Sequence, residues 1–544
     1  MPGKRAAENY PVFQNVSRLW ARAGSVLEKV PLPVLLCLLV FAFFFPVLQN
    51  GFVDWDDVQY VLSNPALRGS WLDALGFSPG YYHPLTTLTY KAEFVLFGLR
   101  PFPYHLTNLV LHLLNCVSAF CLLSALGARR GSAFLAALLF GLHPAHVEPA
   151  AWVSGRKELL WGFFSAWTLI YYLRFAKTRL KKPLILSLAF FILAVLSKPF
   201  AVMLPLVLLL ADLYRGRTLN FRLLLEKTPY LAAAAPLLTL STGTSNFLLK
   251  GGEAAFSLSS GAAAIARNAV FYVQKLLLPV NLSALYPAPE FSAAAVLACL
   301  LALTALLAGC GLAKARGAEK SGGPGCGKKI FFGLGFFLIT VFPALLVSPP
   351  ADRYIYFPAL GLFFLYGEFV LWLYGAADGA RAFRPALILA VSGHLFILGL
   401  ASAQRTYAWR DSLAMWNAVL EKYPREYVAY YGRGNARGAA GEYDGALRDF
   451  DRCLELAPGY WKAFNNRGRL FADAKEYDRA IADYGSAISL NPAEARLYLN
   501  RGNAYFLKGD RGRAAEDYDR ALAIAPGFAP ALENKRRAAG SGVN

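Results

Sequence analysis

Long apolar runs dominate residues 1–402, whereas residues 403–544 contain only short apolar groups separated by polar ones. A straight membrane-spanning helix needs about 20 apolar residues, and we count eleven predicted spans, several of which are shorter than that. The shorter runs predict tilted or broken helices, particularly near Pro199 and Thr228. The predicted spans are residues 31–48, 104–126, 131–151, 159–173, 183–196, 199–213, 228–240, 291–312, 330–347, 354–373 and 385–400.

The polar part of the chain repeats with a fixed period. Pro424, Pro458, Pro492 and Pro526 are each 34 residues apart, which is the period of the tetratricopeptide repeat, a pair of helices. The small and aromatic packing positions recur with the same spacing; they are Gly434, Gly468, Gly502, Ala446, Ala480, Ala514, Phe450, Tyr484 and Tyr518. We therefore assign residues 403–424 to a helical adaptor, 425–526 to three repeats, and 527–544 to a capping helix and tail.

Composition agrees with this division. The chain is 56% apolar and 17% charged, with a mean hydropathy of +0.39, which excludes an ordinary soluble enzyme. The sequence therefore predicts an all-α fold, in which a polytopic membrane domain of about 11 helices precedes a tetratricopeptide α-solenoid.

The net charge of +20 belongs mainly to the membrane part. Residues 1–402 hold 33 basic and 17 acidic side chains, a balance of +16, while residues 403–544 hold 22 and 18, a balance of +4. With the N-terminus in the cytoplasm, 23 of those 33 basic residues fall in cytoplasmic loops, as the positive-inside rule requires. This alternation needs residues 262–286 to form an interfacial or re-entrant helix. It also places the repeats outside the cytoplasm and removes nucleic acid as a partner.

The first outer loop, residues 50–103, begins with an acidic group containing Asp54, Asp56 and Asp57. Adjacent carboxylates repel each other, an arrangement that suits a general base or a metal ligand. The competing interpretation is a solvated helix cap, because aspartate favours such positions. Spacing alone leaves both interpretations open.

A second polar group, His143, His146 and Glu148, follows the third predicted span. Two histidines three residues apart with a nearby glutamate are possible metal ligands, but Pro144 interrupts the helix between them. We therefore favour a hydrogen-bonded polar lining over metal ligation.

A third group, Asp352, Arg353 and Tyr354, lies at the outer end of a later span. An arginine held by a carboxylate is well suited to bind a phosphate with two hydrogen bonds. The alternative is an arginine that extends toward the headgroups from an interfacial aromatic belt. The other basic residues predicted on this side include Lys198, Arg156 and Lys157.

The first helix of each repeat carries asparagines on the predicted inner face of the solenoid. Because an amide both donates and accepts hydrogen bonds, stacked amides can hold the backbone of an extended peptide. The alternative is that they are solvated groove residues or local caps. These asparagines are Asn435, Asn465, Asn466, Asn500 and Asn503.

Several motifs together resemble the TMTC-type proteins, the transmembrane and tetratricopeptide-containing O-mannosyltransferases. The resemblance extends over nearly the whole chain, although this chain has three clear repeats where better-known animal members have more. Its alanine-rich composition is typical of a bacterial relative. The motifs are Phe52-x-x-x-Asp56-Asp57 with Tyr60 and Asn64, Tyr82-His83-Pro84-Leu85, His105-Leu106-x-Asn108-x-x-x-His112-x-x-Asn115, His143-Pro-x-His146-x-Glu148 with Ser154-Gly155-Arg156-Lys157, and Arg353-Tyr-x-Tyr356.

The resemblance implies a GT-C glycosyltransferase fold and a polyprenyl-phosphate sugar as donor. It makes Asp56 the catalytic base, and Asp57 would orient the acceptor or tune Asp56. Arg353, helped by Lys198, Arg156 and Lys157, would bind the donor phosphate, so that no divalent metal or other cofactor is needed. The substrate would be positioned by Glu148, His146, His143, His83 and Tyr354.

We therefore predict a multi-pass membrane enzyme, in a bacterial inner membrane or in the endoplasmic reticulum of a eukaryote. It transfers mannose or another hexose, with inversion, to Ser or Thr of an extracytoplasmic protein held by the repeats. One alternative keeps the chemistry and changes the acceptor to a glycan, lipid or surface polymer. A second is a non-enzymatic membrane scaffold that docks partners through the repeats. A transporter is the weakest option, because the spans show no internal symmetry.

Overall fold

The computed structural model describes residues 30–76, 83–244, 258–287, 325–347, 349–376 and 382–540, and all regular elements within these ranges are helical. The chain divides into two compact units. The membrane unit contains residues up to Phe52 and from Asp56 to Arg410, and the repeat unit contains Val53–Trp55 and Asp411–Asn544. The all-α prediction is confirmed for the described residues.

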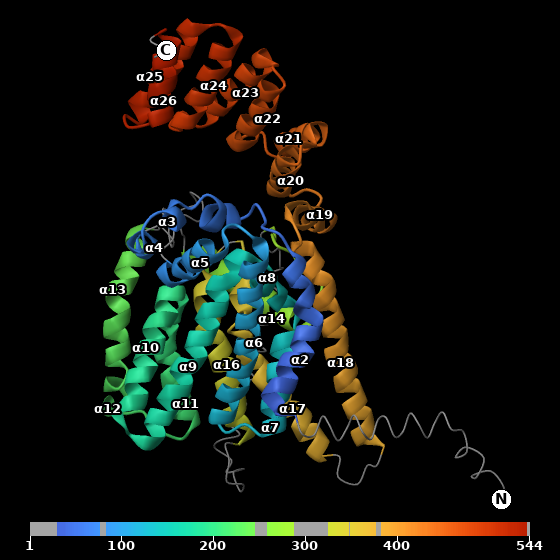
Figure 1. Ribbon diagram of the computed structural model, residues 1–544. Coiled ribbons are helices and arrows are strands. Elements are labelled where there is room, and N and C mark those ends of the chain that lie inside the picture. Colours follow the sequence, from blue (N-terminus) through green and yellow to red (C-terminus); the bar gives the residue numbers. More distant parts are fainter. Residues whose placement is uncertain are drawn as a thin grey trace, which may run out of the picture. The chain divides into compact units, whose positions relative to one another are not determined.

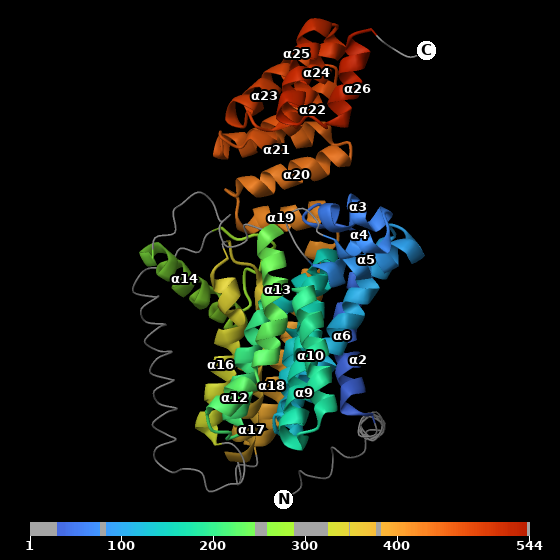
Figure 2. The same ribbon diagram turned by 90° about the vertical axis from the view of Figure 1, so that its left-hand side faces the viewer.

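Helices that run side by side form the body of the membrane unit (Figures 1 and 2). Its elements are α2 (Leu32–Phe44), η1 (Phe45–Gln49), η2 (Val58–Leu62), α3 (Pro65–Arg68), α4 (Trp71–Leu75), α5 (Pro84–Phe97), α6 (Pro101–Ala125), α7 (Arg130–Leu142), η3 (Pro144–His146), α8 (Val147–Ala151), η4 (Val153–Gly155), α9 (Arg156–Thr178), α10 (Lys181–Ser197), η5 (Pro199–Met203), α11 (Leu204–Tyr214), α12 (Phe221–Leu225), α13 (Thr228–Thr244), α14 (Leu258–Leu277), α16 (Cys326–Leu345), η6 (Asp352–Ile355), α17 (Ala359–Ala376), α18 (Phe383–Thr406) and η7 (Tyr407–Trp409).

Five segments in the described ranges are long and apolar enough to cross a membrane. They are Leu32–Gln49, Pro101–Ala125, Cys326–Leu345, Ala359–Ala376 and Phe383–Trp409. Two shorter apolar segments, Arg130–Leu142 and Pro199–Tyr214, accompany them. The total of eleven spans stays a prediction, and the expected span at residues 291–312 lies outside the described residues.

Prolines explain where the helices depart from the predicted spans. The span expected over residues 131–151 is not one helix, because α7 ends at Leu142 and Pro144 begins the short helix η3. The break expected near Pro199 is present, since the 3-10 turn η5 precedes α11 there. The last membrane helix α18 continues to Thr406, beyond the boundary expected at residue 402.

The first outer loop folds into short helices at one end of the membrane unit. There η2, α3, α4 and α5 lie together, and α12 lies at the opposite end (Figure 1). Helix α14, which covers most of residues 262–286, is inclined to the long helices (Figure 2). The ends of the bundle are therefore distinct, and Asp56 and Asp57 belong to the α3–α5 end.

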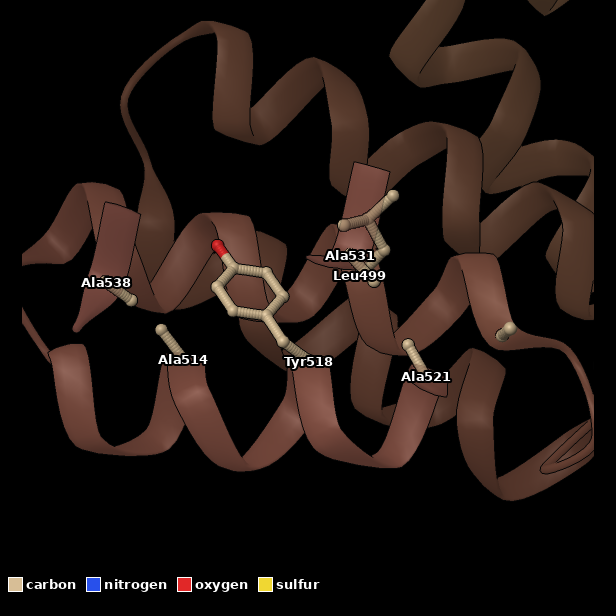
Figure 3. Close-up of a cluster of buried hydrophobic side chains, with 7 residues drawn as sticks. Leu499, Ala514, Tyr518, Ala521, Ala531 and Ala538 are labelled. Atoms are coloured by element: carbon tan, nitrogen blue, oxygen red, sulfur yellow. The ribbon is translucent and has the colours of Figure 1, made fainter. Parts of the chain in front are cut away.

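The repeat unit is a series of helix pairs in which each pair packs against the next. The adaptor helix is α19 (Ser412–Lys422), and the pairs are α20 (Tyr427–Ala439) with α21 (Tyr443–Leu456), α22 (Trp461–Asp473) with α23 (Tyr477–Leu490), and α24 (Ala495–Lys508) with α25 (Arg511–Ile524). The helix α26 (Ala529–Ala538) covers the last pair, where Tyr518 is surrounded by Ala514, Ala521, Ala531 and Leu499 (Figure 3). This arrangement agrees with the predicted packing positions.

Candidate active site

The neighbouring residues Asp56 and Asp57 have opposite environments. Asp57 is fully buried, and its Oδ1 accepts hydrogen bonds from both the backbone N–H and the hydroxyl of Ser154. The side chain of Asp56 is 32% exposed, and its Oδ2 lies 3.5 Å from Nζ of Lys157. Asp57 thus ties the first outer loop to η4, while the Asp56 carboxylate remains accessible to a substrate.

Lys157 connects Asp56 to an aromatic group. Its ammonium lies 4.8 Å from the ring centre of Tyr60 and 5.5 Å from that of Trp152. A cation over aromatic faces gains electrostatic energy without losing its charge. The aromatic faces thus help to hold the Lys157 ammonium next to the Asp56 carboxylate.

Arg353 shares Trp152 with Lys157. Its guanidinium lies 5.4 Å from the Trp152 ring centre, and its Nη1 donates to Oε1 of the fully buried Glu148 at 2.7 Å. The backbone N–H of Arg353 also donates to Glu148, at 3.3 Å. A buried carboxylate that accepts from both the side chain and the backbone fixes the direction of the guanidinium. The arginine predicted from sequence to be held by Asp352 is thus held by Glu148.

Lys198 stands at the junction of α10 and η5 and is paired with Glu158. Its Nζ donates to both carboxylate oxygens of Glu158 at 2.6 Å. The same ammonium lies 3.9 Å from the ring centre of Phe200 and 4.8 Å from that of Tyr354. Burial lowers the pKa of Lys198 to about 8, although the Glu158 carboxylate favours the charged form.

These contacts form a continuous row of cations and aromatic rings that starts at Asp56. Trp152 links Lys157 with Arg353, and Tyr354 links Arg353 with Lys198, since the Arg353 guanidinium lies 4.8 Å from the Tyr354 ring centre. Each cation has one carboxylate partner, so the row is neutral as it stands. A base, two cations held by buried glutamates, a third cation beside the base, and aromatic faces together can bind a sugar phosphate and activate a hydroxyl.

Arg156 has a different environment from the other predicted phosphate ligands. It is fully buried and pairs with Glu93, while its Nε donates to Asn108 at 2.8 Å and its Nη2 to the carbonyl of Tyr104 at 2.9 Å. These contacts join α5, α6 and α9. Its part in phosphate binding stays a prediction, and the geometry favours a role in holding the three helices together.

The histidines predicted to position the substrate lie in two places. Nδ1 of His146 is 2.7 Å from the carbonyl oxygen of Phe140, and Nε2 of His143 is 3.2 Å from that of Leu276, so both buried imidazoles bond to backbone. His83 lies near the cation row instead. Burial, together with the charges on Lys157 and Lys198, holds the pKa of the His83 imidazole well below its usual range. Of these histidines, His83 is the one near the row.

Two acidic residues of this end were not identified from sequence. A lysine within a largely apolar stretch, such as Lys198, needs a buried carboxylate as its partner. Glu158 follows Lys157 directly in the chain, so the sequence offered a signal for this pair. Glu93 gave no such signal, because its partner Arg156 is 63 residues away.

Asp352 forms a second pair beside the row. It accepts from Nη2 of Arg405 at 2.6 Å and from the Tyr286 hydroxyl at 2.8 Å, and Arg405 also donates to the carbonyl of Pro144. The C-terminal end of α18 is therefore attached to η6, the segment that carries Arg353, and to η3.

The repeat unit brings four of the five predicted asparagines into one chain of amides. Asn466 donates to Asn435 at 2.7 Å, Asn465 donates to Asn466 at 2.9 Å, and Asn500 donates to Asn465 at 2.8 Å. Asn503 lies apart from them and accepts from Asn534 and from the Tyr518 hydroxyl. All five asparagines are half-buried, so each retains atoms that face solvent. The described ranges contain no group of three or more His, Cys, Asp or Glu placed to hold a metal ion.

Comparisons with known proteins give similarity to tetratricopeptide-repeat families and to curated O-mannosyl-transferases. Residues 468–509 match the TPR repeat family, and residues 427–460 and 495–528 match the tetratricopeptide repeat family, which confirms the repeats. The first tetratricopeptide domain of human RPAP3 is 24% identical, with a TM-score of 0.21, over 22% of this chain and 93% of that one.

Among curated proteins, the chain is similar to human protein O-mannosyl-transferase TMTC1, with 34% identity over 128 residues, which are 21% of this chain and 14% of that protein. Mouse protein O-mannosyl-transferase TMTC3 is 36% identical over 127 residues, with the same shares. Drosophila melanogaster protein O-mannosyl-transferase Tmtc3 is 40% identical over 99 residues, 14% of this chain and 11% of that protein. The matches thus span 14% or less of the length of these three relatives.

Proposed function

We propose that the chain is a membrane glycosyltransferase that moves a hexose from a polyprenyl-phosphate donor to a hydroxyl of a protein. The observation that carries this proposal is the partly exposed Asp56 carboxylate at the end of a row of three cations, two of which are oriented by buried glutamates. The names of the similar proteins agree with sugar transfer to protein. Because the matches span 14% or less of these relatives, the donor and the acceptor are part of the proposal.

In this proposal Asp56 is the general base. Its carboxylate accepts the proton of a Ser or Thr hydroxyl while the hydroxyl oxygen forms a bond to the anomeric carbon of the sugar. The bond between that carbon and the phosphate oxygen breaks, and its electron pair leaves with the polyprenyl phosphate. Attack from the face opposite the phosphate inverts the anomeric configuration.

Arg353 and Lys198 would stabilise the charge that builds on the departing phosphate. Positively charged donors that are already oriented stabilise such charge without reorganising. Glu148 and Glu158 provide that orientation, since both carboxylates are buried and each is paired with one of the two cations. The remaining N–H groups of Arg353, whose side chain is 14% exposed, would then contact the phosphate.

The amide chain of the repeats would hold the acceptor. Each asparagine amide has two N–H donors and a carbonyl oxygen with two lone pairs, so the bonds within the chain leave capacity for another partner. Asn435 and Asn500 would bond to the backbone of an extended peptide, which fits an enzyme that accepts many sequences. Asn466 would offer only its carbonyl oxygen, because it already donates to both Tyr431 and Asn435.

The test compares Asp56→Asn with Asp57→Asn in the purified full chain, using polyprenyl-phosphate mannose and a Ser/Thr-rich peptide. General base catalysis contributes about 10²–10⁴-fold, so Asp56→Asn is expected to lower kcat by that factor with unchanged thermal stability. Asp57→Asn should instead lower the thermal stability, because it weakens the buried contact with Ser154. Full activity in Asp56→Asn would exclude the proposed base.

A further inference from the structure

A basic cavity lies at the end of the membrane unit opposite the candidate active site. Its volume is about 750 Å³, and this partly open cavity is lined by the end of α9, the connection after α11, and α12. Its lining includes Arg179, Arg217, Arg222, Asn220 and Glu226. None of these residues belongs to the row of cations that begins at Asp56.

The charged side chains at the cavity are connected to one another by ion pairs, which fix their positions. Glu226 accepts from Arg179 at 2.7 Å and from Nη2 of Arg217 at 2.8 Å. Arg217 also reaches Asp212 at 2.8 Å, and Asp212 accepts from Lys227 at 2.7 Å. Cations that are bridged in this way keep a fixed geometry and still have N–H groups left to donate.

The network and the cavity lining carry an excess of positive charge. Four cations, Arg179, Arg217, Arg222 and Lys227, face two carboxylates, Asp212 and Glu226, which gives 4 − 2 = +2. Arg222 is exposed at the cavity and has no ion pair within the described residues. An anionic ligand would balance this charge.

The surroundings of the cavity indicate which anion it holds. Leu219, Phe221, Leu224 and Leu225 have exposed fractions between 45% and 75%. On a chain with several membrane-spanning helices, apolar side chains this exposed at a helix end are covered by lipid. The cavity between them and the arginines therefore lies at the level of the headgroups. Its volume also falls in the range of about 300–1,000 Å³ for organic ligands, which is more than a single phosphate ion needs.

We propose that this cavity binds the phosphate headgroup of an anionic phospholipid. Arg222 contacts the phosphate directly, and Arg179 and Arg217, held by Glu226, complete the site. The acyl chains extend from it over the exposed apolar residues of α12. Basic pockets at the ends of membrane helices are suited to such lipids, with each basic residue near the surface contributing about fivefold in affinity.

Native mass spectrometry of the purified full chain tests this proposal. The protein is mixed with phosphatidylglycerol or with phosphatidylcholine in a neutral detergent, and bound lipid is counted. The unsubstituted chain should retain phosphatidylglycerol in preference, and Arg222→Gln should reduce that retention about fivefold. Arg215→Gln is the matched control, since Arg215 is an exposed arginine of the same connection that does not line the cavity.

Three outcomes would overturn the proposal. Equal retention of the two lipids by the unsubstituted chain would remove the preference for an anionic headgroup. An equal loss in Arg222→Gln and Arg215→Gln would assign the effect to general surface charge. Displacement of phosphatidylglycerol by millimolar inorganic phosphate would identify a site for the free ion. The readout is lipid retention, so none of these outcomes depends on sugar transfer.

Discussion

At the scale of single residues, the charged groups of the candidate site differ in burial and in the partners that they bind. Asp56 and Asp57 are adjacent in sequence, yet one carboxylate is partly exposed beside Lys157 and the other is buried against Ser154. Glu148 and Glu158 are buried and aim Arg353 and Lys198. The chemistry proposed for the site follows from these differences in environment rather than from residue type.

Lys198 gives the site a pH dependence. Because burial lowers its pKa to about 8, the ammonium loses its proton as the pH rises through that value. If Lys198 binds the donor phosphate, kcat/KM for the donor should fall above about pH 8, since this parameter reports the free enzyme.

The variant Lys198→Arg separates this effect from other titrations. An arginine keeps its charge to above about pH 12, so the fall near pH 8 should disappear in the variant even if its rate is lower throughout. Initial rates with polyprenyl-phosphate mannose between pH 6 and 10 measure both profiles. An unchanged fall in the variant would show that another group titrates there.

At the scale of helices, one ion pair recurs in every repeat. Arg433, Arg467 and Arg501 each donate twice to an aspartate 16 residues later; these are Asp449, Asp483 and Asp517. Each pair connects the first helix of a repeat to the second. The aspartates are buried, so these contacts differ from ordinary surface ion pairs.

The central pair can be tested by substitution. Asp483→Asn removes the charge that Arg467 meets with two hydrogen bonds, and we expect a loss of about 1–2 kcal/mol in the free energy of unfolding. Glu476→Gln is the control, because the pair of Glu476 with Arg479 is exposed and contributes about 0–1 kcal/mol. Urea unfolding of the repeat unit in the full chain, followed by limited proteolysis, measures both. Equal effects would contradict the assignment.

The adaptor helix α19 holds the residues that precede Asp56. Within the repeat unit, Asp54 accepts from Nε1 of Trp416 at 2.9 Å, its backbone N–H donates to Ser412 at 2.8 Å, and the rings of Trp55 and Trp416 are 5.0 Å apart. Burial raises the pKa of the Asp54 carboxyl, while side-chain hydrogen bonds with Trp416 and Ser412 favour its charged form. The segment immediately before the proposed base is thus fixed by side chains of α19.

Trp416→Phe keeps the aromatic packing and removes the N–H donor to Asp54. The buried carboxylate then lacks one partner, and we expect a loss of about 1–3 kcal/mol in the free energy of unfolding of the repeat unit. Because Asp56 follows Trp55 directly, kcat should fall while KM for the donor changes little. Urea unfolding and initial rates measure the two effects; an unaltered stability would contradict the role of the hydrogen bond.

At the scale of the whole molecule, the features that could be predicted from sequence are those whose signal lies in neighbouring residues. The prolines at a spacing of 34 predicted the repeats, and the apolar runs predicted the membrane helices, because both signals lie in contiguous sequence. Partners far apart in the chain were not predictable in the same way. Nothing near Arg156 indicates Glu93, and nothing near Arg353 shows that Glu148, rather than Asp352, holds it. Such pairs depend on helix packing, so they appear only in the folded chain.

The central claim, that this chain transfers a sugar from a lipid phosphate by means of Asp56, is tested most directly by following the donor. Purified full chain is incubated with radiolabelled polyprenyl-phosphate mannose and a Ser/Thr-rich peptide, and label in the peptide and released polyprenyl phosphate are counted together. We expect equal amounts of the two with the unsubstituted chain, and amounts of both that are about 10²–10⁴-fold lower with Asp56→Asn. Equal product from the two proteins would contradict the account.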